Sequence, residues 1–192
     1  MSEQPTDVEL VARVQRGDKR AFDLLVLKYQ RKVANLVYRY VRDPHEALDV
    51  TQEAFIKAYR ALADFRGESA FYTWLYRIAI NTAKNYLVAQ SRRPPTEDVE
   101  AETAEQLDVG SRLKEQATPE NYLLQEEIAA TVRRAIDELP EDLRTAIILR
   151  ELEGLSYEEI ATTMGCPIGT VRSRIFRARA AIDAALEPLT KP

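Results

Sequence analysis

Cysteine and histidine are nearly absent from this chain of 192 residues, which has one of each, Cys166 and His45. One cysteine excludes a disulfide within the chain, and one cysteine with one histidine cannot form a zinc finger or ribbon. The sequence also lacks a GxxxxGK[ST] phosphate loop, and a catalytic triad would depend on the single histidine. We therefore expect no enzyme activity, no bound metal and no cofactor.

Long apolar runs are missing as well. No window holds 18 consecutive apolar residues, and residues 1–7 are mostly polar. We therefore expect neither a membrane insertion nor a signal peptide, and the lone cysteine fits the reducing cytoplasm. Glycine is sparse, with 6 residues, whereas Ala, Leu, Glu and Arg are abundant. This composition is typical of an all-α protein.

The chain also lacks the positive excess that is usual in proteins that bind DNA unaided, because its formal net charge is −4. Acidic residues concentrate in residues 96–120, with 8 acidic and 2 basic side chains. Residues 1–95 hold 11 acidic and 16 basic side chains, and residues 121–192 hold 12 acidic and 9 basic side chains. Together with Pro94 and Pro95, which stop the preceding helix, this pattern predicts two small helical domains joined by a flexible acidic linker.

Apolar spacing predicts four helices in residues 1–95. Thr6 and Glu9 form a capping box, and apolar residues then recur at spacings of three and four between positions 22 and 40. Asp43 and Pro44 open a third helix. After a loop around Gly67, a fourth helix is expected from about residue 69 to residue 90.

A short helix, a turn and a longer basic helix follow one another in residues 156–179. Ser156 and Glu159 form a capping box, the short helix should end at Met164–Gly165, and Cys166–Pro167 forms the turn. This order predicts a helix-turn-helix. Val171, Ile175, Ala178 and Ile182 share one helical face and should be buried, whereas Arg172, Ser173, Phe176, Arg177 and Arg179 fall towards the opposite side.

The chemistry of that second face suits duplex DNA. Residues 160–182 contain four arginines and no acid. Arginine guanidinium groups match phosphates and the acceptor edge of guanine, and Phe176 offers an apolar contact to a thymine methyl group. The alternative is an ordinary amphipathic helix with a solvated arginine face.

Aromatic and cationic residues are interleaved in the fourth predicted helix and the loop before it. Six of the fifteen aromatic residues of the chain lie between positions 65 and 86: Phe65, Phe71, Tyr72, Trp74, Tyr76 and Tyr86. Thr73, Arg77, Asn81, Lys84 and Asn85 form a polar stripe. This pattern favours single-stranded DNA, because bases stack on rings while phosphates meet cations. Packing in the core is the alternative for the aromatic group, and Phe65 is the strongest functional candidate because it lies in a loop.

The third predicted helix carries a polar face made of Asp49, Gln52, Glu53 and Lys57. Such a face is either solvated or a docking site for a basic partner helix.

Six stretches carry a family resemblance: DVTQEAFIKAYRAL, FRGESAFYTWLYRIAINTAKNYLVA, RRPP, LPEDLRTA, LRELEGLSYEEIA and CPIGTVRSRIFRAR. With them, the chain resembles the extracytoplasmic-function group of bacterial sigma factors of the sigma-70 family, in particular those of envelope stress. The resemblance covers nearly the whole chain and is weakest in residues 96–118. It implies promoter-specific transcription initiation together with the β and β′ subunits of core RNA polymerase.

The resemblance also implies residue roles. Asp49, Gln52 and Glu53 would face the clamp helices of the polymerase core. Melting and recognition of the −10 element would fall to Phe65, Arg66, Tyr76, Arg77, Asn81, Lys84 and Asn85. Reading of the −35 element would fall to Arg150, Thr170, Arg172, Ser173, Phe176 and Arg177. A membrane-anchored anti-sigma factor would sequester the chain at the inner membrane.

A stand-alone helix-turn-helix regulator is the rival interpretation. It requires a ligand pocket or a dimer seam within residues 1–90, where the sequence instead offers the aromatic and basic cluster. Because phosphate attraction drives non-specific DNA affinity, a chain of net charge −4 should bind duplex DNA poorly by itself.

Overall fold

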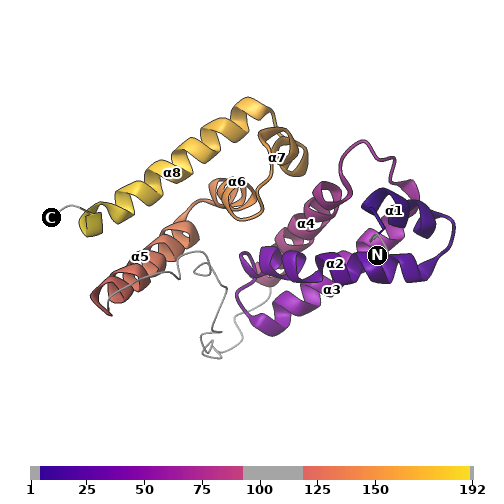
Figure 1. Ribbon diagram of the computed structural model, residues 1–192, viewed down its shortest axis with the longest axis horizontal. Coiled ribbons are helices and arrows are strands. Elements are labelled where there is room, and N and C mark those ends of the chain that lie inside the picture. Colours follow the sequence, from indigo (N-terminus) through magenta and orange to yellow (C-terminus); the bar gives the residue numbers. More distant parts are fainter. Residues whose placement is uncertain (1–4, 93–118, 191–192) are drawn as a thin grey trace. The chain divides into compact units, whose positions relative to one another are not determined.

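The computed structural model describes residues 5–92 and 119–190, and all of its regular elements in these two ranges are helical. The chain divides into two compact units, the first drawn from indigo to magenta and the second from orange to yellow in Figure 1. This confirms the predicted all-α class and the two-domain organisation. Residues 96–118 of the predicted acidic linker lie outside the described residues.

The first unit is a bundle of four helices and one short 3₁₀ turn. The elements are α1 (Asp7–Gln15), α2 (Lys19–Tyr38), α3 (Pro44–Ala61), η1 (Leu62–Asp64) and α4 (Phe71–Ser91). Local sequence sets three of the four helix starts: the Thr6–Glu9 capping box opens α1, Asp18 caps α2, and Asp43 caps α3 before a proline in its first turn.

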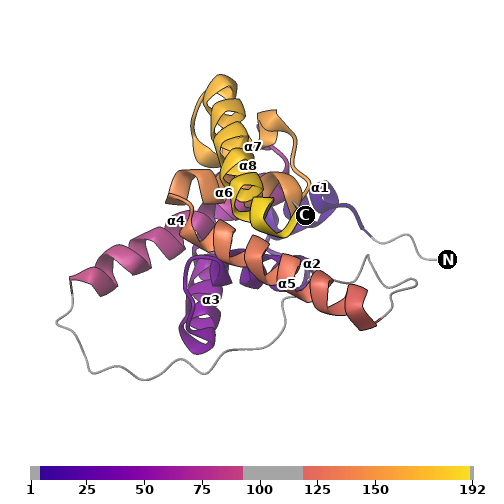
Figure 2. The ribbon, with the colours of Figure 1, turned by 90° about the vertical axis from the view of Figure 1, so that its left-hand side faces the viewer.

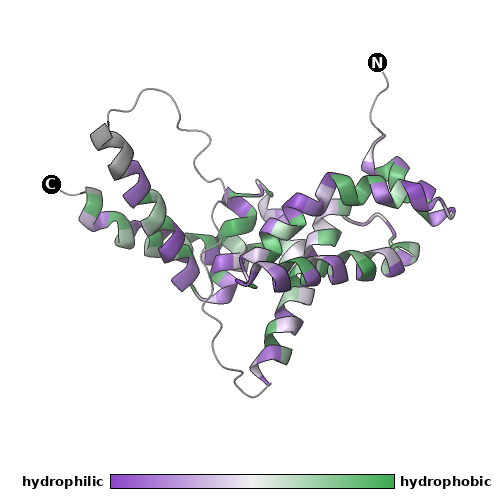
Figure 3. Ribbon diagram, turned by 90° about the horizontal axis from the view of Figure 1, so that it is seen from below, coloured by the Kyte–Doolittle hydropathy of each residue, from purple (hydrophilic) through white to green (hydrophobic). Residues whose placement is uncertain are grey.

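Helices α2, α3 and α4 pack against one another, and α1 lies on α2 and contacts η1 and α4. Fully buried Leu25, Val33, Val37, Leu62 and Leu75 form the middle of this core. Hydrophilic and hydrophobic residues alternate along the helices in Figure 3, as the amphipathic spacing of the sequence predicts. The C-terminal turns of α4 project beyond the bundle in Figure 2.

The second unit contains α5 (Pro119–Glu138), α6 (Glu141–Glu151), α7 (Tyr157–Met164) and α8 (Ile168–Thr190). Helix α8 packs against the other three helices, as Figure 1 shows. Its buried residues Val171, Ile175 and Ala178 meet a core that includes Ile148 and Ile160. Ile182, predicted to be buried, is only half-buried.

Helix boundaries differ from the sequence prediction at two places. Helix α4 begins at Phe71, two residues later than predicted, and Ala70 supplies no side-chain cap. The predicted loop after α3 contains the η1 turn, where the amide of Phe65 donates to the carbonyl oxygen of Leu62 at 3.2 Å. Within the described ranges, no helix is both long enough and apolar enough to cross a bilayer.

Candidate nucleic-acid interface

Helices α7 and α8 form the predicted helix-turn-helix. Ser156 and Glu159 make the expected reciprocal capping box at the start of α7. Gly165 ends that helix in the left-handed conformation, with φ of 63°, which a residue bearing a Cβ adopts only with strain. Cys166 in the turn is half-buried, and its amide donates to the carbonyl oxygen of Ala161 at 3.1 Å.

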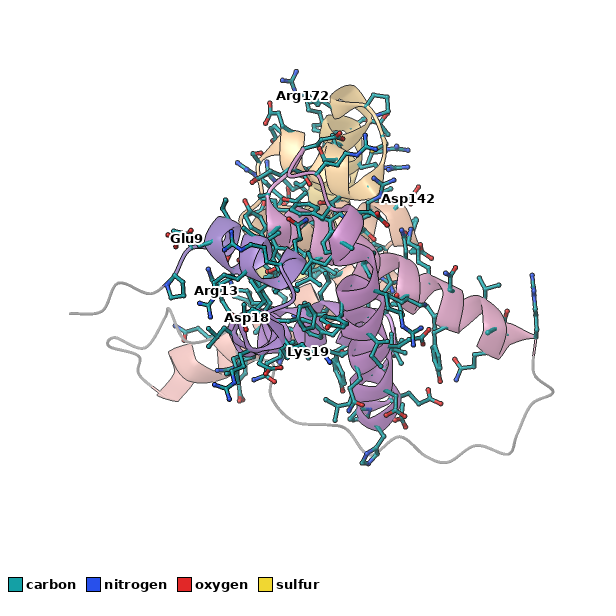
Figure 4. All side chains as sticks on the ribbon, turned by 90° about the vertical axis from the view of Figure 1, so that its right-hand side faces the viewer. Glu9, Arg13, Asp18, Lys19, Asp142 and Arg172 are labelled. Atoms are coloured by element: carbon teal, nitrogen blue, oxygen red, sulfur yellow. The ribbon has the colours of Figure 1, made fainter. Side chains whose placement is uncertain are left out.

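The exposed side of α8 carries the residues that the sequence predicted to read DNA. Arg172, Ser173, Phe176 and Arg177 are all exposed, and we call this set the arginine face of α8. The Phe176 side chain is 73% exposed, which is unusual for an aromatic ring with no binding role. Arg172 projects away from the ribbon in Figure 4. Thr170, at the start of α8, is half-buried.

The four arginines of α8 divide into two pairs with different surroundings. Arg174 forms an ion pair with Asp142 of α6, and Arg179 forms one with Glu151 of α6 at 2.6 Å. Arg172 and Arg177 make no ion pair within the described residues. Arg179 is exposed, as the sequence predicted, but its guanidinium group is paired with an acid of α6 that the sequence of α8 does not reveal.

Arg150 and Arg172 both lie against the ring of Tyr157. The guanidinium carbon of Arg150 is 4.9 Å from the ring centroid, and that of Arg172 is 6.0 Å away. Arg150 also donates to the carbonyl oxygen of Leu155 at 2.8 Å. These contacts restrict both guanidinium groups through cation–π attraction and hydrogen bonding. Tyr157 thereby links the start of α7 to the arginine face of α8.

In the first unit, Phe65 begins the segment of residues 65–70, which we call the Phe65 loop. Its ring is half-buried and lies 4.9 Å from the Trp74 ring and 6.3 Å from the Phe71 ring, between centroids. Arg66 beside it is exposed, and Gly67 has φ of 72°. Residues 65–70 thus present an aromatic ring and a cation beside the first turn of α4.

Helix α4 presents a polar face formed by Arg77, Asn81, Lys84 and Asn85. Arg77, Asn81 and Asn85 are exposed, and Lys84 is half-buried. Thr73, which the sequence placed on this stripe, is only 1% exposed, so it belongs to the packed side of α4. The stripe begins at Arg77 because the first turn of α4 lies against the rest of the bundle.

Tyr76 is 2% exposed, and its ring packs edge-on against Tyr72. In this conformation the ring belongs to the layer beneath the polar face of α4, whereas Phe65 is partly accessible. The structure therefore separates two aromatic residues to which the sequence assigned the same role.

The outer side of α3 carries Asp49, Gln52 and Glu53, all exposed as the sequence predicted. Glu53 forms an ion pair with Lys57 at 2.7 Å. Leu48 and Ile56 flank these polar residues and are 54% and 50% exposed. We call the five residues Leu48, Asp49, Gln52, Glu53 and Ile56 the outer face of α3.

Sequence reasoning missed two residues that shape these surfaces. Tyr157 stacks on two arginines, and Gln15 hydrogen-bonds the backbone just before and at the start of the Phe65 loop. Gln15 is separated from its partners by 47 and 50 positions, so no local pattern could have revealed the contact.

Comparison with known proteins agrees with this geometry. The Sigma-70 region 2 model matches residues 25–93, and the Sigma-70, region 4 model matches residues 129–182. The chain is 67% identical over 191 residues to the RNA polymerase sigma-H factor of Pseudomonas aeruginosa, which covers 100% of this chain and 99% of that protein. It is 66% identical over 191 residues to the ECF RNA polymerase sigma-E factor of Escherichia coli strain K12, with 100% of both chains covered.

A solved structure, CnrH in complex with the cytosolic domain of CnrY, is similar at a TM-score of 0.67 and 26% identity, covering 93% of this chain and 96% of CnrH. The full-length relatives and the two region models agree on one family. The chain therefore belongs to the extracytoplasmic-function group of sigma-70-family RNA polymerase sigma factors.

Proposed function

We propose that the two units of this sigma factor divide the promoter between them, the second reading the −35 element as duplex and the first opening and holding the −10 element. The observation that carries the proposal is the pairing, in one chain, of an arginine face on a helix-turn-helix with an aromatic loop beside a polar helix face. The first suits a major groove and the second suits unpaired bases.

At the −35 element, the arginine face of α8 enters the major groove. Arg172 and Arg177 have no acidic partner in the described chain. Arg177 Nε donates to the carbonyl oxygen of Ser173 at 3.4 Å, and the terminal guanidinium nitrogens of both arginines are available to guanine edges and phosphates. Arg150 contributes from α6, held against Tyr157. Arg174 and Arg179 instead hold α8 on α6.

At the −10 element, the Phe65 loop and the polar face of α4 receive the melted strand. The half-buried ring of Phe65, supported by Trp74, offers a rigid surface on which an unpaired base can stack. The amides of Asn81 and Asn85 donate and accept at base edges, and Arg77 and Lys84 meet phosphates. Buried Tyr76 supports this surface from beneath.

Core polymerase docks on the outer face of α3. Exposed carboxylates beside exposed Leu48 and Ile56 fit a partner helix that is both basic and apolar. Docking matters energetically because the chain carries a net charge of −4, so the polymerase must hold it on DNA.

A membrane-anchored anti-sigma factor restrains the chain in the cytoplasm, at the inner membrane. Support comes from CnrH, a structural relative at 26% identity that was solved with the cytosolic domain of a protein partner. Release of such a partner would free the chain for core polymerase during envelope stress.

The decisive experiment is in vitro transcription with core polymerase, with and without this chain, on a template that has both elements and on a template with a scrambled −35 element. We expect transcription to depend on the chain and to fall when the −35 element is scrambled. No transcription by the holoenzyme, together with tight binding of duplex DNA by the chain alone, would favour the stand-alone regulator.

A further inference from the structure

The side chain of Gln15, the last residue of α1, bridges to the turn that leads into the Phe65 loop. Its Nε2 atom donates to the carbonyl oxygen of Leu62 at 3.0 Å and to the carbonyl oxygen of Phe65 at 2.9 Å. A glutamine amide nitrogen carries two hydrogens, so both of its donors are used on one short stretch of backbone.

The two acceptors mark the ends of the η1 turn. Leu62 begins the turn and Phe65 follows it, and the amide of Phe65 also donates to the carbonyl oxygen of Leu62 at 3.2 Å. Holding both carbonyl groups therefore fixes the direction in which the chain leaves η1. That direction sets where the Phe65 ring lies against Trp74, at 4.9 Å between centroids.

The donor itself sits on a firmly anchored helix. Thr6 and Glu9 close the capping box at the start of α1, and Leu10 and Val11 are buried. Asp7 accepts a hydrogen bond from the Tyr29 hydroxyl group and one from Lys28 Nζ at 2.6 Å, which ties α1 to α2. Because α1 is held at its start and along its buried face, the Gln15 amide reaches the turn from a fixed position.

We propose that Gln15 is a positioning residue for −10 recognition, whose amide holds the Phe65 loop in the conformation that receives an unpaired base. The inference rests on the proposed role of the loop and adds a residue that touches no DNA. Since Gln15 is exposed and lies outside the apolar core, its effect acts on the loop more than on the stability of the unit.

The first test uses the chain alone and requires no promoter. Trp74 is the single tryptophan, so fluorescence reports on the packing partner of Phe65. Two variants remove the donors of Gln15: Gln15→Ala, and Gln15→Glu, which keeps the shape of the side chain but has no donor when ionised. Both should shift Trp74 emission and increase its quenching by acrylamide. The matched control is Gln90→Ala, which removes the hydrogen bond from Gln90 of α4 to Glu46 of α3. Gln90 lies about 24 Å from Trp74 along the axis of α4.

Unchanged Trp74 emission and quenching in both Gln15 variants would overturn the inference while leaving the proposed function untouched. A fall in the thermal midpoint of the Gln15 variants large enough to account for the fluorescence change would also overturn the inference, since Gln15 would then act on stability alone. A shift in the Gln15 variants, with the Gln90 variant and the thermal midpoints unchanged, supports it.

The second test measures open-complex formation by holoenzyme reconstituted with each variant. Loss of this pair of hydrogen bonds, one part-buried and one exposed, should reduce the equilibrium for opening a duplex −10 element by about fivefold. Phe65→Ala serves as the reference for loss of the loop itself. A defect in Phe65→Ala but none in Gln15→Ala or Gln15→Glu would reject the positioning role, whereas no defect in Phe65→Ala would reject the proposed function of the loop.

Discussion

The guanidinium group of Arg179 lies 2.6 Å from the carboxylate of Glu151, so this arginine joins α8 to α6. The hydrogen bonds that Arg179 donates to the Glu151 carboxylate raise the pKa of Arg179 above its ordinary value. Arg177, two residues earlier on the same helix, is exposed and has no ion pair within the described residues. Two neighbouring arginines of one basic helix therefore have different tasks, and their variants should behave differently.

Arg177→Ala should weaken initiation at promoters with an intact −35 element. If the side chain makes a bidentate contact to guanine, the loss corresponds to about 1–3 kcal/mol. The measurement is transcription in vitro on matched templates with intact and scrambled −35 elements. An equal loss on both templates would contradict base reading by Arg177.

Arg179→Ala is the matched control for that experiment. The ion pair with Glu151 is exposed, so its removal should lower the free energy of unfolding by at most about 1 kcal/mol. Urea unfolding followed by circular dichroism measures that loss. Discrimination between the intact and the scrambled −35 element should remain as in the original chain.

Asn81→Ala should impair open-complex formation more than engagement of the duplex. The exposed amide of Asn81 lies on the polar face of α4, where it is available to an unpaired base. We expect it to make no contact with the −35 duplex. Permanganate reactivity of thymines in the −10 element should fall. On a template with a mismatched −10 element that is already open, most of the lost transcription should return, and unchanged reactivity on the duplex would count against the role.

Ser156→Ala should destabilise the helix-turn-helix. The Ser156 hydroxyl oxygen accepts from the Glu159 amide at 3.2 Å, and Glu159 Oε2 accepts from the Ser156 amide at 2.8 Å. Loss of the cap should cost about 1 kcal/mol, while Ser156→Asp should cost less because aspartate also caps helices. Urea unfolding by circular dichroism measures both, and the Trp74 transition of the first unit should not move.

Lowering the pH should reduce the free energy of unfolding of the first unit, because Asp18 and Glu9 become protonated. Hydrogen bonds from Arg13 hold the pKa of Asp18 below its ordinary 3.8, and hydrogen bonds from Thr6 lower the pKa of Glu9. A carboxyl group whose pKa is lower in the folded chain stabilises it above the unfolded pKa, and this stabilisation is lost as pH falls through the folded pKa.

The Asp18→Asn variant isolates the charge, because asparagine still caps α2. Its urea midpoint, followed by Trp74 fluorescence, should fall less steeply between about pH 5 and about pH 2 than that of the original chain. Parallel acid curves for the two chains would show that the Arg13–Asp18 pair contributes nothing to acid stability.

Residues that act through their nearest neighbours in sequence could be predicted directly. Thr6 with Glu9, and Ser156 with Glu159, cap their helices as the sequence indicates, since both partners of a capping box are three positions apart. The exposed positions of Arg172 and Phe176 likewise follow from helical periodicity. Thr73 shows where periodicity fails, because the start of α4 is packed on more than one side and a polar residue there is buried.

The sequence by itself determined the helical class, the two units, the helix-turn-helix and the family, because capping, turn chemistry and apolar spacing act over a few residues and several long motifs occur in order. The tertiary structure alone decided which arginines of α8 are available, because their acidic partners come from α6. It also decided that Gln15 holds the Phe65 loop, since a contact across 50 positions exists only after α1 packs beside η1.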